Sequence, residues 1–297
     1  MRTLPLLLAA LVLPSQGLAA QTIFRQDEIL TADRPEAWAL NYFAAASLIT
    51  PFGETPSLAP GDWALALDLG HIPRLSDDEQ RVGFNGSKAE DLNKSPVFGR
   101  LRLMLGLPAH WVAEIGYTPP LSIDGTRSHD LIALAIGRRV IDRGDYTLSI
   151  RAFGQHGGAR GDITCPGELA GVSDSERNPF GCQAASHDRV TLNYYGIDLT
   201  SGWAAGRWNW HASVGAARTE LAVQVDALTF DVRDRSRVVS RDVLPFVAVG
   251  ASREVGPNWS VAMEVLHVPL TVRRGPDAPH ENDPLTSLRL QLRYRAR

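Results

Sequence analysis

The feature that most constrains this chain is a stretch of strict alternation over residues 97–123. It predicts two β-strands joined by a tight connection at residues 108–110, because successive side chains of a strand point to opposite faces. One face brings Arg102 and Glu114 within reach of each other as diagonal neighbours. Large apolar residues opposite full charges indicate a transmembrane β-barrel, with lipid outside and a polar lumen. The apolar face consists of Leu101, Leu103, Leu105, Leu107, Trp111, Ala113, Ile115 and Tyr117.

The N-terminus predicts a secretory signal peptide over residues 1–20. Arg2 supplies a positive charge, and residues 4–13 form an apolar run that is too short to span a bilayer. Small residues then offer a cleavage site near Ala19 or Ala20. An N-terminal anchor helix is the alternative. Because no later apolar run approaches the ~20 residues of a transmembrane helix, strands are the expected route into a membrane.

Residues 21–60 differ in character from the rest. Apolar side chains within residues 34–49 recur at the spacing of one helical face, with Asp33 as the expected N-cap. Prolines and glycines between residues 51 and 61 then predict an extended linker. The segment is interpreted as a periplasmic tail, as one further strand, or as a plug that enters the barrel. The plug would present Trp38, Tyr42 and Phe43.

Residues 61–297 predict one all-β domain, an antiparallel transmembrane barrel of about 10 strands, with 10 to 12 as the range. The strand expected at 190–199 changes its apolar parity partway, which predicts a bulge. The strands are expected at 63–71, 97–107, 111–123, 131–140, 146–156, 190–199, 208–221, 243–253, 259–271 and 288–294.

The connections between these strands alternate between long and short. In bacterial barrels long loops lie outside the cell and short turns face the periplasm, so both ends of this barrel are expected to be periplasmic. Each outward-running strand begins with an aromatic residue, as expected for side chains at the membrane interface. This interface girdle consists of Trp63, Trp111, Tyr146, Trp208 and Trp259.

The signal peptide, the alternating strands, the girdle and the final strand SLRLQLRYRAR together resemble Gram-negative outer-membrane β-barrel proteins. The resemblance covers nearly the whole mature chain and implies a location in the bacterial outer membrane. It also implies outer-membrane lipid, lipopolysaccharide and the assembly machinery as partners. The helix and linker at the N-terminus are loosely similar to the plug-bearing transporters of fatty acids and hydrocarbons.

Ten charged positions are predicted to line the lumen. They form either a charge ladder that fills a narrow barrel, or a track that sets selectivity for a small solute. The arginine excess would suit anions. The positions are Asp68, Arg100, Arg102, Glu114, Arg139, Arg151, His211, Glu264, Arg289 and Arg293.

We therefore expect a narrow, porin-like channel or transporter for small molecules. One alternative is a surface enzyme, a protease or a lipid-modifying barrel, built on histidines at the outer strand ends. Another is a structural or adhesive barrel that acts through arginine-rich outer loops on lipopolysaccharide phosphates. No catalytic residue is assigned, and an enzyme is not the expectation. The histidines are His71, His129, His156 and His187, and the loop arginines are Arg233, Arg235, Arg237, Arg241, Arg273 and Arg274.

Cys165 and Cys182 are the only cysteines and fall in one outer loop. Because export leads to an oxidising compartment, they are expected to form a disulfide. Neither a cofactor nor a metal is expected. The net charge of −3 and a pI near 6.2 give no basic excess that would point to nucleic acid.

Overall fold

A computed structural model describes residues 21–23, 27–53, 55–275 and 277–296. Ten antiparallel strands form one barrel. The barrel is closed, because each strand pairs with two neighbours, and β9 pairs with β10 as well as with β7. The fold class predicted from the alternation is thus confirmed. Around the barrel the strands are β3 (Trp63–His71), β6 (Val97–Leu107), β7 (Trp111–Tyr117), β9 (Thr126–Arg143), β10 (Tyr146–Gly161), β11 (Asp188–Ala205), β12 (Trp208–Gln224), β15 (Arg237–Glu254), β16 (Trp259–Val268) and β19 (Leu285–Arg295).

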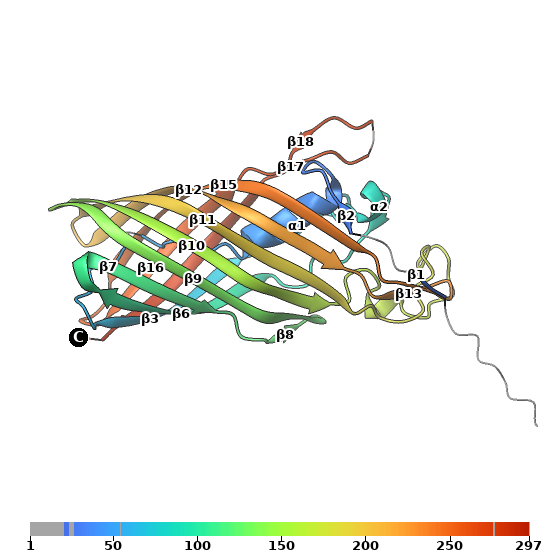
Figure 1. The fold of residues 1–297 in the computed structure, drawn as a ribbon, viewed down its shortest axis with the longest axis horizontal. Helices are drawn as coiled ribbons and strands as arrows, with labels where there is room; N and C mark the ends of the chain where they lie inside the picture. The colour runs from blue at the N-terminus through green and yellow to red at the C-terminus, as the bar shows by residue number, and fades with distance from the viewer. Residues whose placement is uncertain (1–20, 24–26, 54, 276, 297) are drawn as a thin grey trace, which may run out of the picture.

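The remaining elements lie at the N-terminus or in the connections (Figure 1). The longest is the helix α1, and none of the described helices has the length and apolar character to cross a membrane. The predicted signal peptide lies outside the described residues. These elements are β1 (Gln21–Ile23), β2 (Glu28–Ile29), α1 (Pro35–Ala46), β4 (Arg81–Val82), α2 (Gly83–Gly86), β5 (Lys88–Ala89), β8 (Ser122–Ile123), β13 (Ala227–Thr229), β14 (Val232–Asp234), β17 (Thr271–Val272), β18 (Glu281–Asn282), and 3₁₀ turns at Pro108–His110 and Gly167–Leu169.

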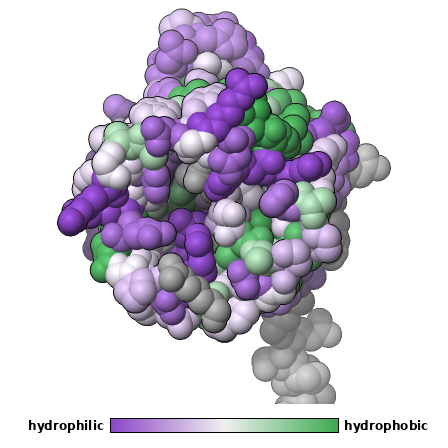
Figure 2. Space-filling model, turned by 90° about the vertical axis from the view of Figure 1, so that its left-hand side faces the viewer, coloured by the Kyte–Doolittle hydropathy of each residue, from purple (hydrophilic) through white to green (hydrophobic). Residues whose placement is uncertain are grey.

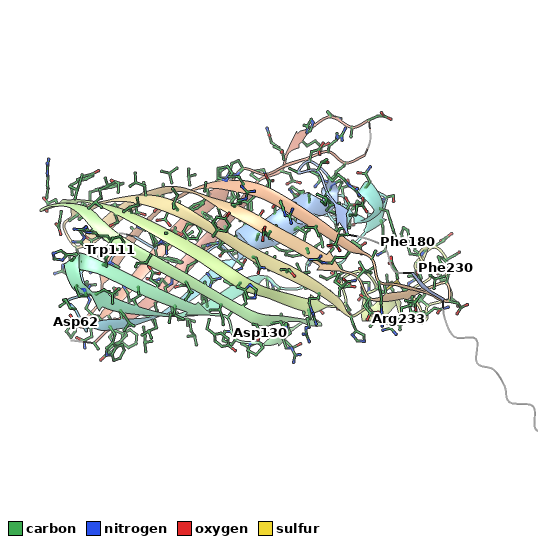
Figure 3. All side chains as sticks on the ribbon, in the orientation of Figure 1. Asp62, Trp111, Asp130, Phe180, Phe230 and Arg233 are labelled. Carbon is green, nitrogen blue, oxygen red and sulfur yellow. A yellow bond between two sulfur atoms is a disulfide. The ribbon has the colours of Figure 1, made fainter. Side chains whose placement is uncertain are left out.

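The outer surface of the barrel is an apolar belt. On β3, for example, every second residue from Trp63 to His71 is exposed, while the residues between them are buried. Large apolar side chains on the other strands, such as Leu134 and Met263, are likewise about half exposed. A closed barrel with this belt satisfies its backbone internally and matches a bilayer outside. Each of the five girdle aromatics is the first residue of its strand, and Figure 3 shows Trp111 at the short-turn end of the barrel.

The short turns and long loops separate to opposite ends of the barrel. Turns of two to four residues, such as Gly144–Asp145 and Gly206–Arg207, gather at one end together with the C-terminus (Figure 1, left). We call this the inner end and the long-loop end the outer end. Figure 2 looks onto the inner end, where hydrophilic residues predominate.

The strand boundaries differ from the sequence-based expectation in most strands. β7 ends at Tyr117 and not at residue 123, and β9, β10, β11, β12 and β15 extend further toward the outer end than expected. The turn expected from residue 201 begins only after Ala205, because β11 is 18 residues long. The bulge expected in the same strand is absent: β11 keeps one register against β12 throughout. Val190 and Leu192 are apolar yet point inward, because the outer half of the lumen is filled by an apolar helix. The register shifts lie instead between β9 and β10.

The disulfide between Cys165 and Cys182 is confirmed, with 5.7 Å between the Cα atoms. It closes the β10–β11 loop, which rests on the β13–β14 hairpin of the next outer loop. Backbone bonds from Gln183 N to Leu228 O and from His187 N to Asp226 O join the two loops. The disulfide thus orders an outer cap over one side of the barrel mouth, which we define as residues 162–187 and 225–236.

Candidate functional site: the plug and its arginine collar

The helix α1 lies inside the outer half of the barrel, and we call residues 35–58 the plug. Pro35 occupies the first turn, and Arg34, not the expected Asp33, is the N-cap. Asp33 instead accepts a hydrogen bond from Thr31 and pairs with Arg273. Ten of the twelve helix residues are buried, on every side of the helix. A helix that is apolar all round needs a surrounding core, which the barrel wall supplies.

The helix side chains bond to outer loops and strand ends. Trp38 is 1% exposed, and its Nε1 donates to the backbone oxygen of Asp283 at 3.0 Å. The Tyr42 hydroxyl donates to Pro73 O at 2.7 Å. Asn41 donates to the carboxylate of Asp242 at 3.0 Å. Each acceptor lies in a long loop or in the outer part of β15, so the helix is fixed at the outer end.

Below the helix, the plug backbone is held by four barrel arginines, Arg100, Arg102, Arg151 and Arg289. We call them the arginine collar. Six successive plug carbonyls accept hydrogen bonds from them, and all four side chains are buried. Ala45 O and Ala46 O accept from Arg289 at 2.9 and 3.1 Å, Ser47 O from Arg100 at 2.9 Å, Leu48 O from Arg289 at 2.5 Å, Ile49 O from Arg151 at 2.8 Å, and Thr50 O from Arg102 at 3.0 Å.

This arrangement solves two problems of burial at once. The last carbonyls of a helix have no partner within the helix, and a cation favours the negative end of its dipole. Buried guanidinium groups in turn require acceptors. Arg289 meets both needs, since it caps the end of α1. Tyr194 reinforces the contact, because its hydroxyl accepts from Ile49 N and donates to Ser47 O, each at 2.9 Å.

The collar is balanced by carboxylates of the barrel wall. Arg102 pairs with Asp68 and, at 3.0 Å, with Glu114. Arg151 lies 3.4 Å from the same Glu114 and 2.8 Å from Asp198. The charges therefore alternate in one buried row across five strands. Buried charges are tolerated in this form because each one is paired and hydrogen-bonded.

The structure thus brings Asp68, Arg102, Glu114 and Arg151 into one network, with Arg100 and Arg289 beside it. His211 and Glu264 form a separate buried pair, 3.3 Å apart. Arg139 and Arg293 lie lower, around a cavity at the inner end. In this structure the collar arginines bond to the plug and to carboxylates, and do not line an open track for anions.

Sequence reasoning missed three members of this network: Asp198, Gln155 and Tyr194. Gln155 bonds to Arg100 and, at 3.0 Å, to Leu192 O. All three lie on β10 or β11, where apolar inward residues hid the alternation. A strict two-residue period counted back from Thr200 would have placed Asp198 and Tyr194 inside.

The linker leaves the lumen at the inner end, along β6. Gly61 N donates to Gly106 O at 3.0 Å, and Gly106 N donates to Asp62 O at 2.9 Å. A Cβ at Gly106 would lie 2.1 Å from Ala59 O, so this close approach requires glycine. Small inward residues of the wall leave room for both parts of the plug. Ala133 and Ala135 of β9 belong to the same buried cluster as α1, and Ala64 and Ala66 of β3 pack around Leu58 of the linker. The helix itself leans on β11, β12, β15 and β19.

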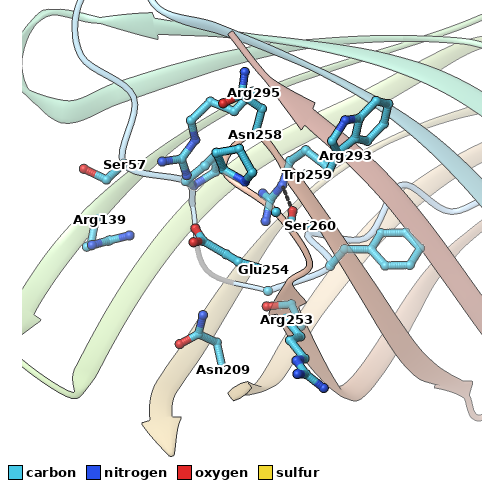
Figure 4. A pocket seen from close by; sticks show the side chains of 16 residues that line it. Ser57, Arg139, Asn209, Arg253, Glu254, Asn258, Trp259, Ser260, Arg293 and Arg295 are labelled. Atoms are coloured by element: carbon cyan, nitrogen blue, oxygen red, sulfur yellow. Dashed lines mark hydrogen bonds between the residues drawn. The ribbon is translucent and has the colours of Figure 1, made fainter. Parts of the chain in front are cut away.

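Several cavities border the plug, and two of them lie at its opposite ends. The outer one, of about 150 Å³, is lined mainly by apolar side chains, including Leu40 and Phe43 of α1. The inner one, of about 200 Å³, is lined mainly by polar residues of the inner end together with Phe52 and Gly53 of the plug (Figure 4). Residues 44–51 separate them.

The outer histidine His129 and the six arginines expected in the outer loops contact charged neighbours. His129 Nε2 lies 2.7 Å from Arg160 and 3.2 Å from Asp130. Asp188, next to His187, accepts from Thr164 N and from the Ser186 hydroxyl, each at 2.7 Å, and so anchors the disulfide loop. Among the described residues, no three His, Cys, Asp or Glu side chains are grouped to hold a metal ion. The arginines expected in the outer loops each pair with a carboxylate, but two of them, Arg237 and Arg241, lie in β15 and not in a loop. The six are Arg233, Arg235, Arg237, Arg241, Arg273 and Arg274.

The closed barrel, the belt and the segregated loops define the architecture. The fold is that of an outer-membrane β-barrel. By sequence, no family model and no curated protein matches the chain. Among solved structures the chain is similar in fold to three outer-membrane proteins: the protease OmpT of Escherichia coli (12% identity, TM-score 0.41, covering 80% of this chain and 94% of that one), the attachment invasion locus protein Ail of Yersinia pestis (10%, 0.34, 80% and 99%), and the toluene transporter TodX of Pseudomonas putida (11%, 0.34, 91% and 99%).

Proposed function

We propose that this protein resides in the bacterial outer membrane and passes small molecules along a path that its plug keeps closed. The long loops face the outside and the short turns the periplasm. The observation that carries the proposal is that the plug borders both cavities, Phe43 the outer one and Phe52 the inner one. A shift of residues 44–51 would join them. Lipid and lipopolysaccharide surround a barrel so located, and the outer-membrane assembly machinery would insert it.

The lining of the outer cavity favours an uncharged solute. Leu40, Phe43 and Val190 present apolar surface to it, and the nearby charges of Arg34 and Glu36 are paired with each other at 2.7 Å. The arginine excess of the sequence suggested anions. Because the collar arginines bond to carbonyls and carboxylates, a free cationic track is not part of the closed state.

A cross-link between plug and wall tests the path. An added Cβ at Gly137 would lie 3.0 Å from Thr55 Oγ1, a separation that a disulfide can span. In proteoliposomes swelling in uncharged solutes, we expect oxidised Thr55→Cys/Gly137→Cys protein to admit them at least tenfold more slowly than either single variant. Reductant should restore the rate.

Wild-type protein with and without reductant is the matched control, since it carries the native disulfide. Equal rates for the oxidised and reduced double variant would contradict a moving plug. A wild-type protein that admits no solute at all would contradict the transport proposal itself.

A second candidate is adhesion through the outer cap, as the sequence analysis left open. Phe230 favours it: the side chain is 66% exposed at the tip of the β13–β14 hairpin, where its φ is +47°. Exposed aromatics at strained positions often serve binding. Phe230→Ala should reduce attachment of expressing cells to host-cell or abiotic surfaces without changing solute entry. Unchanged attachment would remove this candidate.

A further inference from the structure

Residues 21–23 and 27–33 lie at the outer end of the barrel, not at the inner end where both ends of the barrel wall lie. β1 runs parallel to β14 of the outer cap, with Gln21 paired to Val232 and Thr22 to Arg233. β2 pairs in the same way with the outer end of β15. In Figure 1, β1 and β2 lie toward the right, at the long-loop end of the barrel.

Side chains and backbone fix this position further. Asp27 forms an ion pair with Arg237. Asp33 pairs with Arg273 at 3.0 Å, and Arg273 N donates to Asp33 O at 2.7 Å. Both arginines belong to the outer part of the barrel.

From this point the chain runs through the whole lumen. The helix α1 fills the outer half, the collar holds residues 45–50, and Leu58 reaches the inner end, where it packs against Met104 and Val112. The segment therefore enters the lumen at the outer end and leaves it at the inner end. Ten of the twelve residues of α1 are buried, so the helix itself occupies the outer half of the lumen.

We propose that the barrel carries its own N-terminal segment across the outer membrane and displays residues 21–23 and 27–33 on the cell surface. An exported chain reaches the outer membrane from the periplasm. The outer position of β1 therefore requires either passage through the lumen or closure of the barrel around the segment. Both routes place Thr22 outside, while Trp63 begins β3 at the periplasmic interface.

Single cysteines and a membrane-impermeant maleimide test this topology. The two native cysteines are joined and therefore silent. Thr22→Cys is the test position, and its side chain is exposed. Asp78→Cys, in the loop after β3 and 95% exposed, is the outer control. Ala205→Cys, exposed beside a short turn, is the inner control. A migration shift on heating checks that each variant has folded.

In intact cells we expect Thr22→Cys to be labelled within twofold of Asp78→Cys. Ala205→Cys should reach less than a tenth of that level until the outer membrane is permeabilised. Labelling of Thr22→Cys only after permeabilisation, with Asp78→Cys labelled in intact cells, would overturn the inference and leave the barrel's orientation intact. Labelling of Ala205→Cys but not Asp78→Cys in intact cells would overturn both.

Discussion

The two halves of the lumen are filled by different physical means. In the outer half, α1 packs against inward-facing apolar residues such as Leu221, Leu244 and Leu266, each at most 2% exposed. In the inner half, an extended chain is held by guanidinium groups. The free energy gained by apolar packing is roughly proportional to the buried area and does not depend on direction, whereas the strength of a hydrogen bond depends on its distance and angle. We therefore expect that α1 can move by small amounts within the outer half, whereas the hydrogen bonds of the collar are either formed or lost.

The same difference determines how much stability a substitution costs in each half of the lumen. Removing a buried methyl group leaves a cavity whose cost depends on how far the neighbours relax. Removing one partner of a buried ion pair leaves an uncompensated charge. Substitutions in the collar should therefore cost more than substitutions of similar size in the outer half.

The largest effect is expected from Arg151→Met. It leaves Asp198 without its two bonds, of 3.0 and 2.8 Å, and should lower the free energy of unfolding by about 3–5 kcal/mol. Urea titration of the detergent-solubilised barrel measures the change. Adding Asp198→Leu should recover at least half of the loss, since it removes the orphaned carboxylate. Arg207→Met, in a short turn, should stay within about 0.5 kcal/mol of wild type. A loss no larger than that of the control would show that the collar is not what holds the inner half.

In the outer half, Leu40→Ala should cost about 2 kcal/mol, the low end of the range for buried leucines. The reason is that Leu40 is 4% exposed but borders the outer cavity, so its neighbours can relax into the space. Leu288→Ala on the outer surface is the control, because that side chain is 46% exposed. The same urea titration applies. A loss above that of Arg151→Met would reverse the ranking of the two halves.

Tyr194→Phe tests the contact at the place where the helical part of the plug meets its extended part. It removes only the hydroxyl that bonds to Ile49 N and Ser47 O, and an orphaned buried amide costs about 1–3 kcal/mol. Tyr195→Phe is a matched control on the next residue, which faces outward and is 59% exposed. Faster hydrogen exchange at Ile49 in the first variant alone would support the assigned role. Equal exchange in both variants would argue against it.

The smallest expected effect is on the pH dependence of stability, and it arises from one residue at the outer end. Burial raises the pKa of the Glu90 carboxyl to about 7, although Lys88 at 2.6 Å lowers it. The folded protein then binds more protons than the unfolded chain between about pH 4.5 and 7, so this contribution to stability is largest at low pH and declines as the pH rises through that range. Glu90→Gln should flatten the decline in unfolding experiments at pH 5 and pH 8. An unchanged slope would mean that Glu90 is not the group responsible.

The wall of the barrel and most of its inward charges were predictable from the sequence, whereas the path of the plug through the lumen was not. Strict alternation in β3, β6, β7, β16 and β19 placed their inward charges, because in these strands the lumen face is polar or small and the lipid face apolar. In β11 the inward Val190 and Leu192 broke that contrast. Their apolar character depends on α1, which lies more than 140 residues away in the sequence.

The direction of the plug was equally hidden. A helical period identifies α1, but the period does not show from which end a segment enters a barrel. The deciding contacts are between distant parts of the chain, such as Trp38 with Asp283 and Thr22 with Arg233. Ala64 and Ala66 of β3 leave a space that Leu58 fills, a contact that the sequence pattern does not reveal.

The collar binds carbonyl oxygens, which every residue type possesses. Residues 45–50 could therefore be exchanged for others of similar size without loss of a single arginine contact. In an evolving lineage the collar arginines would stay fixed while the plug sequence changes. A comparison of related sequences would therefore identify the arginines of the collar but not the plug residues that they bind. For the same reason, the side chains of the plug could be redesigned while the hydrogen bonds from the collar arginines to its backbone are kept.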